Sequence, residues 1–199
     1  RANPREDGLT HIVQGTIDGR PYTQEEILSL LTLFLHAGLD TVAMALCFIT
    51  IHLAKNPQDR DYIRAHPENV MAVIQELLRR YTITQLARRM AEDHEYDGVT
   101  MKKGDLVMLS PCFFNQDPVI NPNPDAVDFE REGGRMMTFG AGPHTCAGAL
   151  LARREIAVFL GEWLTRIPDF TLDPARPPKM SVQQQNNVLE LWIKWPVEG

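Results

Sequence analysis

The stretch FGAGPHTCAG (139–148) places a cysteine and a histidine among three glycines and a proline. Cys146 lies directly before a predicted helix, where unpaired N–H groups and the helix dipole stabilise an anion, so a thiolate is favoured there. Glycines allow backbone conformations and close approaches that a Cβ would block. These residue types indicate a thiolate presented by a tightly turned loop.

Taken alone, the stretch leaves several interpretations open. Cys146 is a thiolate ligand, a buried cysteine in a structural turn, a zinc ligand together with His144, or a nucleophile with His144 as its base. Zinc is disfavoured because the second pair of ligands that structural zinc sites show is missing. A nucleophile is disfavoured because no third group that would orient the base is evident.

The composition indicates which kinds of partner and which compartment to expect. The 199-residue chain has a net charge of −6, which does not favour nucleic acid, because nucleic acid normally selects a basic face. Its cysteines (Cys47, Cys112 and Cys146) are few, widely spaced and odd in number, so we expect a reducing compartment and a cytoplasmic protein. The first ten residues lack the apolar core of a signal peptide. Since the chain begins without Met, we expect a fragment or a processed chain.

One long helix is predicted early in the chain. Thr23 and Glu26 form a capping-box pattern, and the apolar run that follows continues to about Ala54, before Lys-Asn-Pro at 55–57 ends it. The run is apolar enough to resemble a membrane span, but a charge near a bilayer centre is costly and the run contains Asp40. We therefore expect a buried helix of a soluble protein and no membrane association.

The rest of the chain predicts further helices and a smaller β region. Helices are expected over 58–65, 68–81 and 149–167, and strands over 82–90, 94–101 and 106–110. The proline-rich segment 111–129 has no periodicity, and the last thirty residues are predicted as short strands and turns. We find no internal repeat and no domain linker. The predicted helices and strands together give a fold class that is mainly α with a small β region.

The cysteine stretch resembles the haem-binding loop of the cytochrome P450 family, whose pattern is Phe-x-x-Gly-x-Arg/His-x-Cys-x-Gly. Every fixed position of that pattern is matched in this sequence. The matching residues are Phe139, Gly142, His144, Cys146 and Gly148.

A second motif, HAGLDT (36–41), is similar to the Ala/Gly-Gly-x-Asp/Glu-Thr segment of the family's long central helix. Gly38 leaves room for oxygen beside the backbone, and the Thr41 hydroxyl can bond the Ala37 carbonyl and open the helix locally. Taken without the resemblance, the segment is as well explained by a helix with one buried acid.

A third motif, ELLR, is similar to the family's structural Glu-x-x-Arg pair, here Glu76 and Arg79, which Arg131 joins from the irregular segment. Alone it would be an ordinary surface pair at a spacing of three. The order of the motifs also follows the family. The text near the end, LARREI and EWLTRIPDF, is most similar to the bacterial camphor-hydroxylating class.

The resemblance implies a haem-thiolate monooxygenase in which Cys146 is the axial ligand of the iron of haem b. It implies that Asp40 and Thr41 deliver protons to bound dioxygen. The other residues that it assigns to the haem are His144, Arg88, Phe139, Gly140, Ala37 and Gly38.

The resemblance also implies partners: a small organic substrate, O2, and two electrons from NAD(P)H through a reductase and a [2Fe–2S] ferredoxin. Arg153 and Arg154, behind the cysteine, are candidates for docking an acidic ferredoxin. The alternative for either arginine is a solvated helix face.

Several residues depart from the camphor-hydroxylating pattern. Leu86 stands two residues before the propionate-contacting arginine, where the class has an aspartate. His36 stands where an apolar residue is usual, and QQQNN (183–187) replaces a mostly apolar loop. We therefore expect a substrate with hydroxyl, carbonyl or ring-nitrogen groups, or else that His36 reaches the haem iron or a bound water. The residues of this polar pocket are His36, Thr84, Gln85, Gln184 and Gln185.

The resemblance covers only the C-terminal half of a complete member. We therefore expect 1–199 to be the C-terminal portion of a single P450 domain whose N-terminal half is absent from this chain. Left bare, Leu30, Leu33 and Phe34 would form an apolar patch that monomers rarely tolerate, which predicts a longer protein, a second chain or a swapped dimer. The alternative functions are a truncated haem-binding or sensor protein without turnover, and an interaction fragment without haem.

Overall fold

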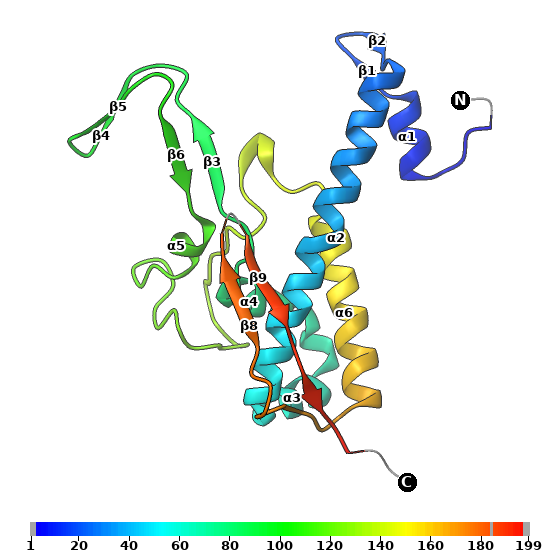
Figure 1. Ribbon diagram of the computed structural model, residues 1–199, viewed down its shortest axis with the longest axis vertical. Helices are drawn as coiled ribbons and strands as arrows, with labels where there is room; N and C mark the ends of the chain where they lie inside the picture. Colours follow the sequence, from blue (N-terminus) through cyan, green and yellow to red (C-terminus); the bar gives the residue numbers. More distant parts are fainter. Residues whose placement is uncertain (1–2, 184, 197–199) are drawn as a thin grey trace. The chain divides into compact units, whose positions relative to one another are not determined.

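The structure is a computed structural model that describes residues 3–183 and 185–196. It divides the chain into two compact units, 1–40 and 41–199, and the helix α2 (Gln24–Lys55) begins in the first and ends in the second. Figure 1 shows helices together with short two-stranded sheets. This confirms the predicted fold class, mainly α with a small β region.

The first unit contains α1 (Gly8–Gln14), the hairpin of β1 (Thr16–Ile17) and β2 (Arg20–Pro21), and the first part of α2. The predicted capping box is present, because Glu26 N donates to Thr23 Oγ1 (3.2 Å) and Thr23 N donates to the Glu26 carboxylate (2.8 Å). Arg20 adds an ion pair to Glu26 at 2.7 Å, and this guanidinium, followed by the Thr23 N–H, lowers the pKa of Glu26 to about 2. Local hydrogen bonds therefore fix the start of α2.

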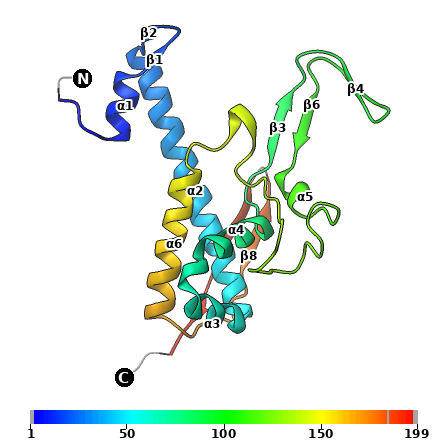
Figure 2. The same ribbon diagram turned by 180° about the vertical axis from the view of Figure 1, so that it is seen from behind.

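In the second unit, the end of α2 packs with three further helices around one apolar core (Figures 1 and 2). These are α3 (Pro57–Ala65), α4 (Val70–Arg80), which follows the short helix η1 (Pro67–Asn69), and α6 (Ala149–Arg166). Core residues recur at spacings of three and four, so each helix turns one face inward. The most deeply buried are Ile49, Leu53, Val73, Ile74, Leu77, Ile156 and Leu160.

The burial predicted for α2 holds only for its second part, from Ala45 onward. Towards its start, Leu33 is 61% exposed and Phe34 is 46% exposed, whereas Leu30 is half-buried. By length and composition alone, α2 is also apolar enough to cross a membrane. Its exposed part is the apolar patch that the sequence predicts for a bare helix.

The strands form two-stranded antiparallel sheets: β3 (Leu86–Arg89) with β6 (Leu106–Leu109), β4 (His94–Tyr96) with β5 (Val99–Met101), β7 (Thr171–Leu172) with β10 (Ile193–Lys194), and β8 (Lys179–Val182) with β9 (Asn186–Glu190). The single strand predicted over 94–101 is wrong. Asp97 and Gly98 have φ of 50° and 75° and turn the chain into a hairpin, as Asp-Gly pairs favour. The strand predicted over 82–90 is also shorter, because ladder pairing begins at Leu86.

The segment 111–129, predicted as irregular, begins with a short helix, α5 (Pro111–Asn115). Ser110 caps it, since its Oγ accepts a hydrogen bond from Phe113 N (3.3 Å), and Pro111 occupies the first helical position. The Ser-Pro pair was a helix-start signal that the sequence prediction did not use.

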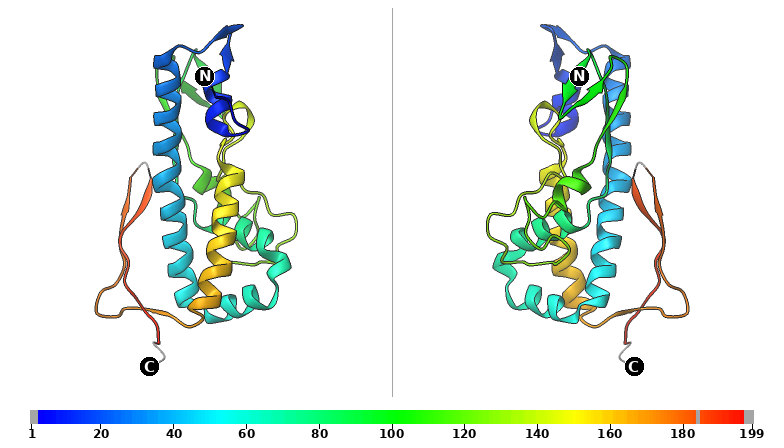
Figure 3. Two further views of the ribbon diagram at one scale, coloured as in Figure 1. Left: turned by 90° about the vertical axis from the view of Figure 1, so that its right-hand side faces the viewer. Right: turned by 90° about the vertical axis from the view of Figure 1, so that its left-hand side faces the viewer.

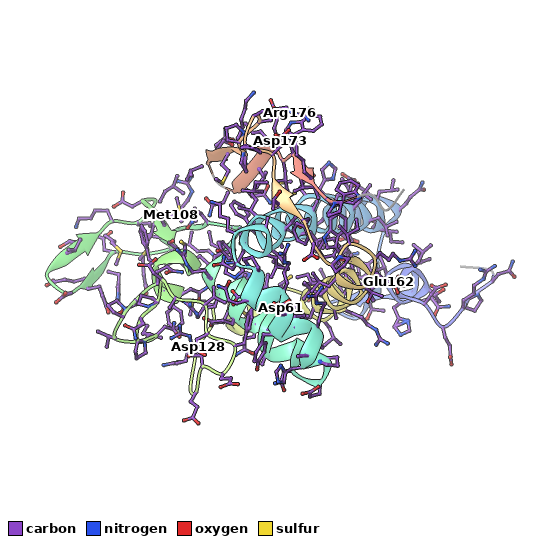
Figure 4. The ribbon with its side chains drawn as sticks, turned by 90° about the horizontal axis from the view of Figure 1, so that it is seen from below. Asp61, Met108, Asp128, Glu162, Asp173 and Arg176 are labelled. Atoms are coloured by element: carbon purple, nitrogen blue, oxygen red, sulfur yellow. The ribbon has the colours of Figure 1, made fainter. Side chains whose placement is uncertain are left out.

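The C-terminal strands are tied together by Asp173, whose side chain is buried. It accepts hydrogen bonds from Lys194 Nζ (2.8 Å) and Arg176 Nε (3.0 Å), and Figure 4 shows Asp173 and Arg176 side by side. These cations, Lys194 first, lower the pKa of Asp173 to about 2. The β8–β9 hairpin lies beside α2 (Figure 3), where Val188 N donates to Met44 Sδ at 3.2 Å.

A polar cluster closes the core at the end of α2. The His52 ring is buried, with Nε2 2.6 Å from Asp59 Oδ2 on α3 and Nδ1 2.8 Å from the hydroxyl of Tyr81, which ends α4. The Asn56 amide nitrogen also approaches Nδ1, at 3.3 Å. Since an amide NH2 only donates, Nδ1 accepts and Nε2–H donates to Asp59, which makes the ring neutral.

The pH dependence of stability follows from this cluster. Burial, and to a smaller extent the charge of Arg80, lower the pKa of His52 below 6.5, against the opposing effect of Asp59. The folded state therefore favours the neutral ring, so its contribution is complete above the ordinary pKa and is lost as the pH falls through it.

We expect the free energy of unfolding, measured by urea denaturation, to fall between about pH 7.5 and about pH 5.5 more steeply in the wild type than in His52→Gln. The exposed His94 on β4 provides the control, because His94→Gln should keep the wild-type slope. Equal slopes for the wild type and His52→Gln would contradict the assignment of a neutral, buried His52.

Candidate functional site

The loop that carries Cys146 is closed by its own backbone. Cys146 N donates to Phe139 O and Gly140 N donates to Met137 O, each at 2.8 Å. Gly140 has φ of 73°, and a Cβ at this position would lie 3.3 Å from His144 O. The loop therefore requires glycine at 140, both for its left-handed conformation and for the close return of the chain.

Cys146 presents its thiol at the N-terminal side of α6. The cysteine is exposed, and the first residue of α6 is Ala149, with Gly148 as its N-cap. The helix predicted after Cys146 is confirmed, since α6 begins at Ala149 as expected, and the short helix η2 (Gly142–His144) lies on the other side of the cysteine in the sequence. The Cys146 carbonyl still accepts from Ala149 N (3.2 Å), so the loop joins the helix end without a break.

The candidate haem residues come from three places in the chain. Phe139, Gly140 and His144 lie in the Cys146 loop, where the first two are half-buried and His144 is exposed. Arg88 comes from β3, where its Nη1 donates to Ala87 O at 2.8 Å. The remaining candidates, Ala37, Gly38, Asp40 and Thr41, lie on α2, with Asp40 at the end of the first unit and Thr41 at the start of the second.

The predicted pocket residues fall into two groups. On α2, His36 is exposed and lies in an open groove with Thr32 and Leu33, and its Nδ1 donates to Thr32 O at 2.8 Å. In the second unit, Thr84 forms an isolated antiparallel bridge with Gln185.

Beside that bridge, Gln85 Oε1 is shielded from solvent and, in the part of the chain that the structure describes, has no hydrogen-bond donor. A buried carbonyl oxygen without a donor is uncommon in native structures. Gln184 lies outside the described residues.

Glu76 is the centre of a buried ionic cluster. It is 4% exposed, and its carboxylate accepts from Arg79 Nε (2.7 Å) and Nη2 (2.8 Å), from Arg131 Nε (3.1 Å) and from the backbone N of Asp128 (3.0 Å). Arg79, itself 1% exposed, lies one turn along α4. The structure thus brings Glu76, Arg79 and Arg131 together, and the two guanidinium groups compensate the buried charge.

A hydrogen-bond chain continues from this cluster to the cysteine loop. Arg79 Nη1 donates to Asn115 O (2.9 Å) at the end of α5. The Asn115 side chain, fully buried, accepts from Met137 N (2.7 Å) and donates to Thr138 Oγ1 (2.9 Å), directly before Phe139. Sequence reasoning missed Asn115, because nothing local distinguishes it from the other asparagines of this segment.

A second buried asparagine holds the same segment. Asn121 is fully buried, accepts from Arg135 N (3.0 Å) and donates to Arg135 O (3.0 Å), so its amide acts as a strand partner for that residue. Together with Asn115 it fixes the backbone that leads into the Cys146 loop.

Known proteins are similar to this chain in sequence and in fold. A model of the cytochrome P450 family matches residues 64–191. The chain is 41% identical over 178 residues to a probable cytochrome P450 127A1 of Sinorhizobium fredii, and 33% identical over 175 residues to the polyketide biosynthesis cytochrome P450 PksS of Bacillus subtilis. These alignments cover 89% and 86% of this chain, and 43% of each relative.

The fold is similar to the crystal structures of cytochrome P450 CYP101C1 (TM-score 0.93, 37% identity) and CYP101J2 (TM-score 0.91, 36% identity), with 98% of this chain and 50% of each of those covered. These neighbours fit the camphor-hydroxylating class that the sequence resembles. The chain spans about half the length of the relatives that it matches. With the family model matching well over half of its residues, this chain belongs to the cytochrome P450 family.

Proposed function

We propose that the protein to which this chain contributes is a haem-thiolate monooxygenase, which inserts one oxygen atom of O2 into a C–H bond of a small organic substrate. The other oxygen atom leaves as water, with two electrons and two protons consumed. The observation that carries the proposal is the Cys146 loop, where an exposed thiol, a helix N-terminus and membership of the family coincide.

The donor set at Cys146 suits haem b better than a lone metal ion. Among residues 3–183 and 185–196, no three His, Cys, Asp or Glu side chains gather to hold a metal, so zinc bound to Cys146 and His144 would lack protein ligands. Iron protoporphyrin IX brings its own nitrogen ligands and needs one axial side chain from the protein. An exposed thiol on a loop held by backbone hydrogen bonds meets that need.

When bound, the haem activates dioxygen, and a thiolate ligand favours O–O cleavage. Cys146 would hold the iron, while His144 and Arg88 would donate hydrogen bonds to the propionates. Phe139 and Gly140 would line the haem.

A second set of residues, on α2, would serve the oxygen site. Asp40 and Thr41 would hold and pass the protons that reach the oxygen site, and Ala37 and Gly38 carry too little side chain to block it. Asp40 is exposed on α2, which suits exchange of protons with water.

The rest of the P450 fold would come from a longer protein or from a second chain. This chain spans half of its structural neighbours, and the first part of α2 exposes Leu33, Leu35 and Leu39, each by more than 60%. Single exposed apolar residues are ordinary, but here they occur on more than one side of the helix, with Leu35 and Leu39 one turn apart and Leu33 on a different side. We propose that the missing half of the fold packs around this part of α2.

The two electrons would come from NAD(P)H through a reductase and a [2Fe–2S] ferredoxin. The exposed Arg154 at the start of α6 suits an acidic ferredoxin, as charge complementarity speeds the encounter of two proteins. Reduction that is no slower in Arg154→Glu than in the wild type would argue against this docking site. The cytoplasmic location stays a prediction.

The haem proposal predicts the absorption spectrum. The reduced, haem-loaded protein under carbon monoxide should show the red-shifted Soret band of thiolate ligation, and Cys146→Ser should abolish that band. Cys112→Ser, at a half-buried cysteine of α5, is the matched control and should keep it. A wild type with a histidine-like band, or a Cys146→Ser variant with an unchanged band, would contradict the proposal.

The polar groups around the Thr84–Gln185 bridge support a substrate that carries a hydrogen-bond donor. Gln85 Oε1 is buried without a donor in the described residues, and leaving such an acceptor unpaired is costly. A substrate hydroxyl or N–H would satisfy it. His36 fits the same class, because Nδ1 donates to Thr32 O and Nε2 remains for a substrate group.

This substrate class is tested by binding titrations that follow the spin state of the haem. Gln85→Leu should weaken the binding of a hydroxylated ligand roughly tenfold, which corresponds to the loss of about one hydrogen bond. It should leave the binding of the apolar analogue unchanged. Gln58→Leu, on the exposed side of α3, should change neither. Tighter binding of purely apolar ligands, unaltered by Gln85→Leu, would contradict the assignment.

A further inference from the structure

Arg153, in the second turn of α6, folds back over the loop that carries Cys146. Its guanidinium carbon lies 4.5 Å from the centre of the Phe139 ring, a cation–π contact. The next residue, Arg154, is exposed, whereas Arg153 is half-buried. In residues 3–183 and 185–196 no carboxylate pairs with Arg153. Its charge is therefore directed at an aromatic ring and not at an anion.

Phe139 connects that ring contact to the cysteine. The ring also packs against the apolar core. The Phe139 carbonyl accepts the Cys146 N–H at 2.8 Å, which is the hydrogen bond that closes the loop. The ring thus contacts both the core and Arg153, and any movement of Phe139 moves the acceptor of the Cys146 amide.

The surroundings of Arg153 favour this arrangement over a solvated one. Arg153 lines a groove of about 490 Å³ between α4, the 128–136 segment and the start of α6, which it shares with the ionic cluster of Glu76, Arg79 and Arg131. The Glu76 carboxylate is already bound by those two arginines, so the Arg153 guanidinium is left to the face of the Phe139 ring. A cation–π contact strengthens as it is desolvated, so the half-buried Arg153 guanidinium favours one position of the Phe139 ring over its alternatives.

We propose that Arg153 is a positioning residue for Cys146, which holds the Phe139 ring and through it the closed form of the cysteine loop, and so sets the electronic environment of the iron ligand. The inference rests on the proposed function, because it concerns the same ligand. Hydrogen bonding and charge around the sulfur tune the reduction potential of a haem-thiolate centre. An unpaired cation beside the loop favours the reduced state, which carries one more negative charge.

The inference predicts the behaviour of variants in the haem-loaded protein, reduced chemically so that no partner has to dock. Arg153→Ala should make the reduction potential of the iron more negative. It should also change the spread of the g values in the low-spin electron paramagnetic resonance spectrum. Arg153→Lys should restore part of the wild-type values, since an ammonium group also binds an aromatic face. Arg154→Ala, one residue away and equally basic, is the matched control and should match the wild type in both measurements.

The connection through Phe139 is tested by a double-mutant cycle. In a Phe139→Leu background, Arg153→Ala should shift the potential several-fold less than it does in the wild type, because without the ring the guanidinium is no longer held beside the loop. Equal shifts in the two backgrounds, or a shift in Arg154→Ala as large as in Arg153→Ala, would overturn the inference. If Arg153→Ala does not take up haem, Arg153→Lys and Arg153→Gln are measured in its place. Wild-type reduction potentials and resonance signals in both of these variants would overturn the inference.

The two proposals fail in different ways. A wild type without a thiolate spectrum would overturn the proposed function and the inference with it. A wild type with that spectrum, and an Arg153→Ala variant with unchanged potential and resonance signals, would overturn the inference alone.

Discussion

The buried carboxylate of Glu76 is the interaction on which the second unit depends. An ionised group with 4% exposure is tolerated only when its charge and its lone pairs are satisfied, and here two guanidinium groups and one backbone N–H do so. Arg79 lies on the same helix, but Arg131 lies 55 residues away. The cluster therefore holds the irregular segment after α5 against α4, because separating them would leave an unpaired charge in the core.

The conformation of the cysteine loop depends on this cluster. Arg79 binds the Asn115 carbonyl, and the Asn115 side chain holds the backbone at Met137 and the hydroxyl of Thr138. Phe139 comes next, and its carbonyl receives the Cys146 N–H. A segment without regular secondary structure is thus given one conformation by buried polar contacts, and the exposed thiol is presented from a fixed base.

The sequence was sufficient where the determining interactions are local. The capping box at Thr23 and the proline after 167 predict helices that the structure has, and the glycine pattern identifies the cysteine loop before any coordinates. It was insufficient where two parts of the chain decide together. Asn115 gains its role from residues 22 and 23 positions away, and the place of Arg153 depends on a ring on another segment. In two places, the start of α5 at Ser110 and Pro111 and the turn at Asp97 and Gly98, the signal was present and was not used.

The control of the cysteine loop by Glu76 can be measured by hydrogen–deuterium exchange at the Cys146 amide. In Glu76→Gln, where breaking a buried pair costs about 3–5 kcal/mol, this amide should exchange at least about tenfold faster than in the wild type. The amide of Leu160, in the core part of α6, should stay protected, and Glu68→Gln, at an exposed carboxylate of η1, should change neither. Exchange at Cys146 that is no faster in Glu76→Gln than in Glu68→Gln would show that Glu76 does not order the cysteine loop.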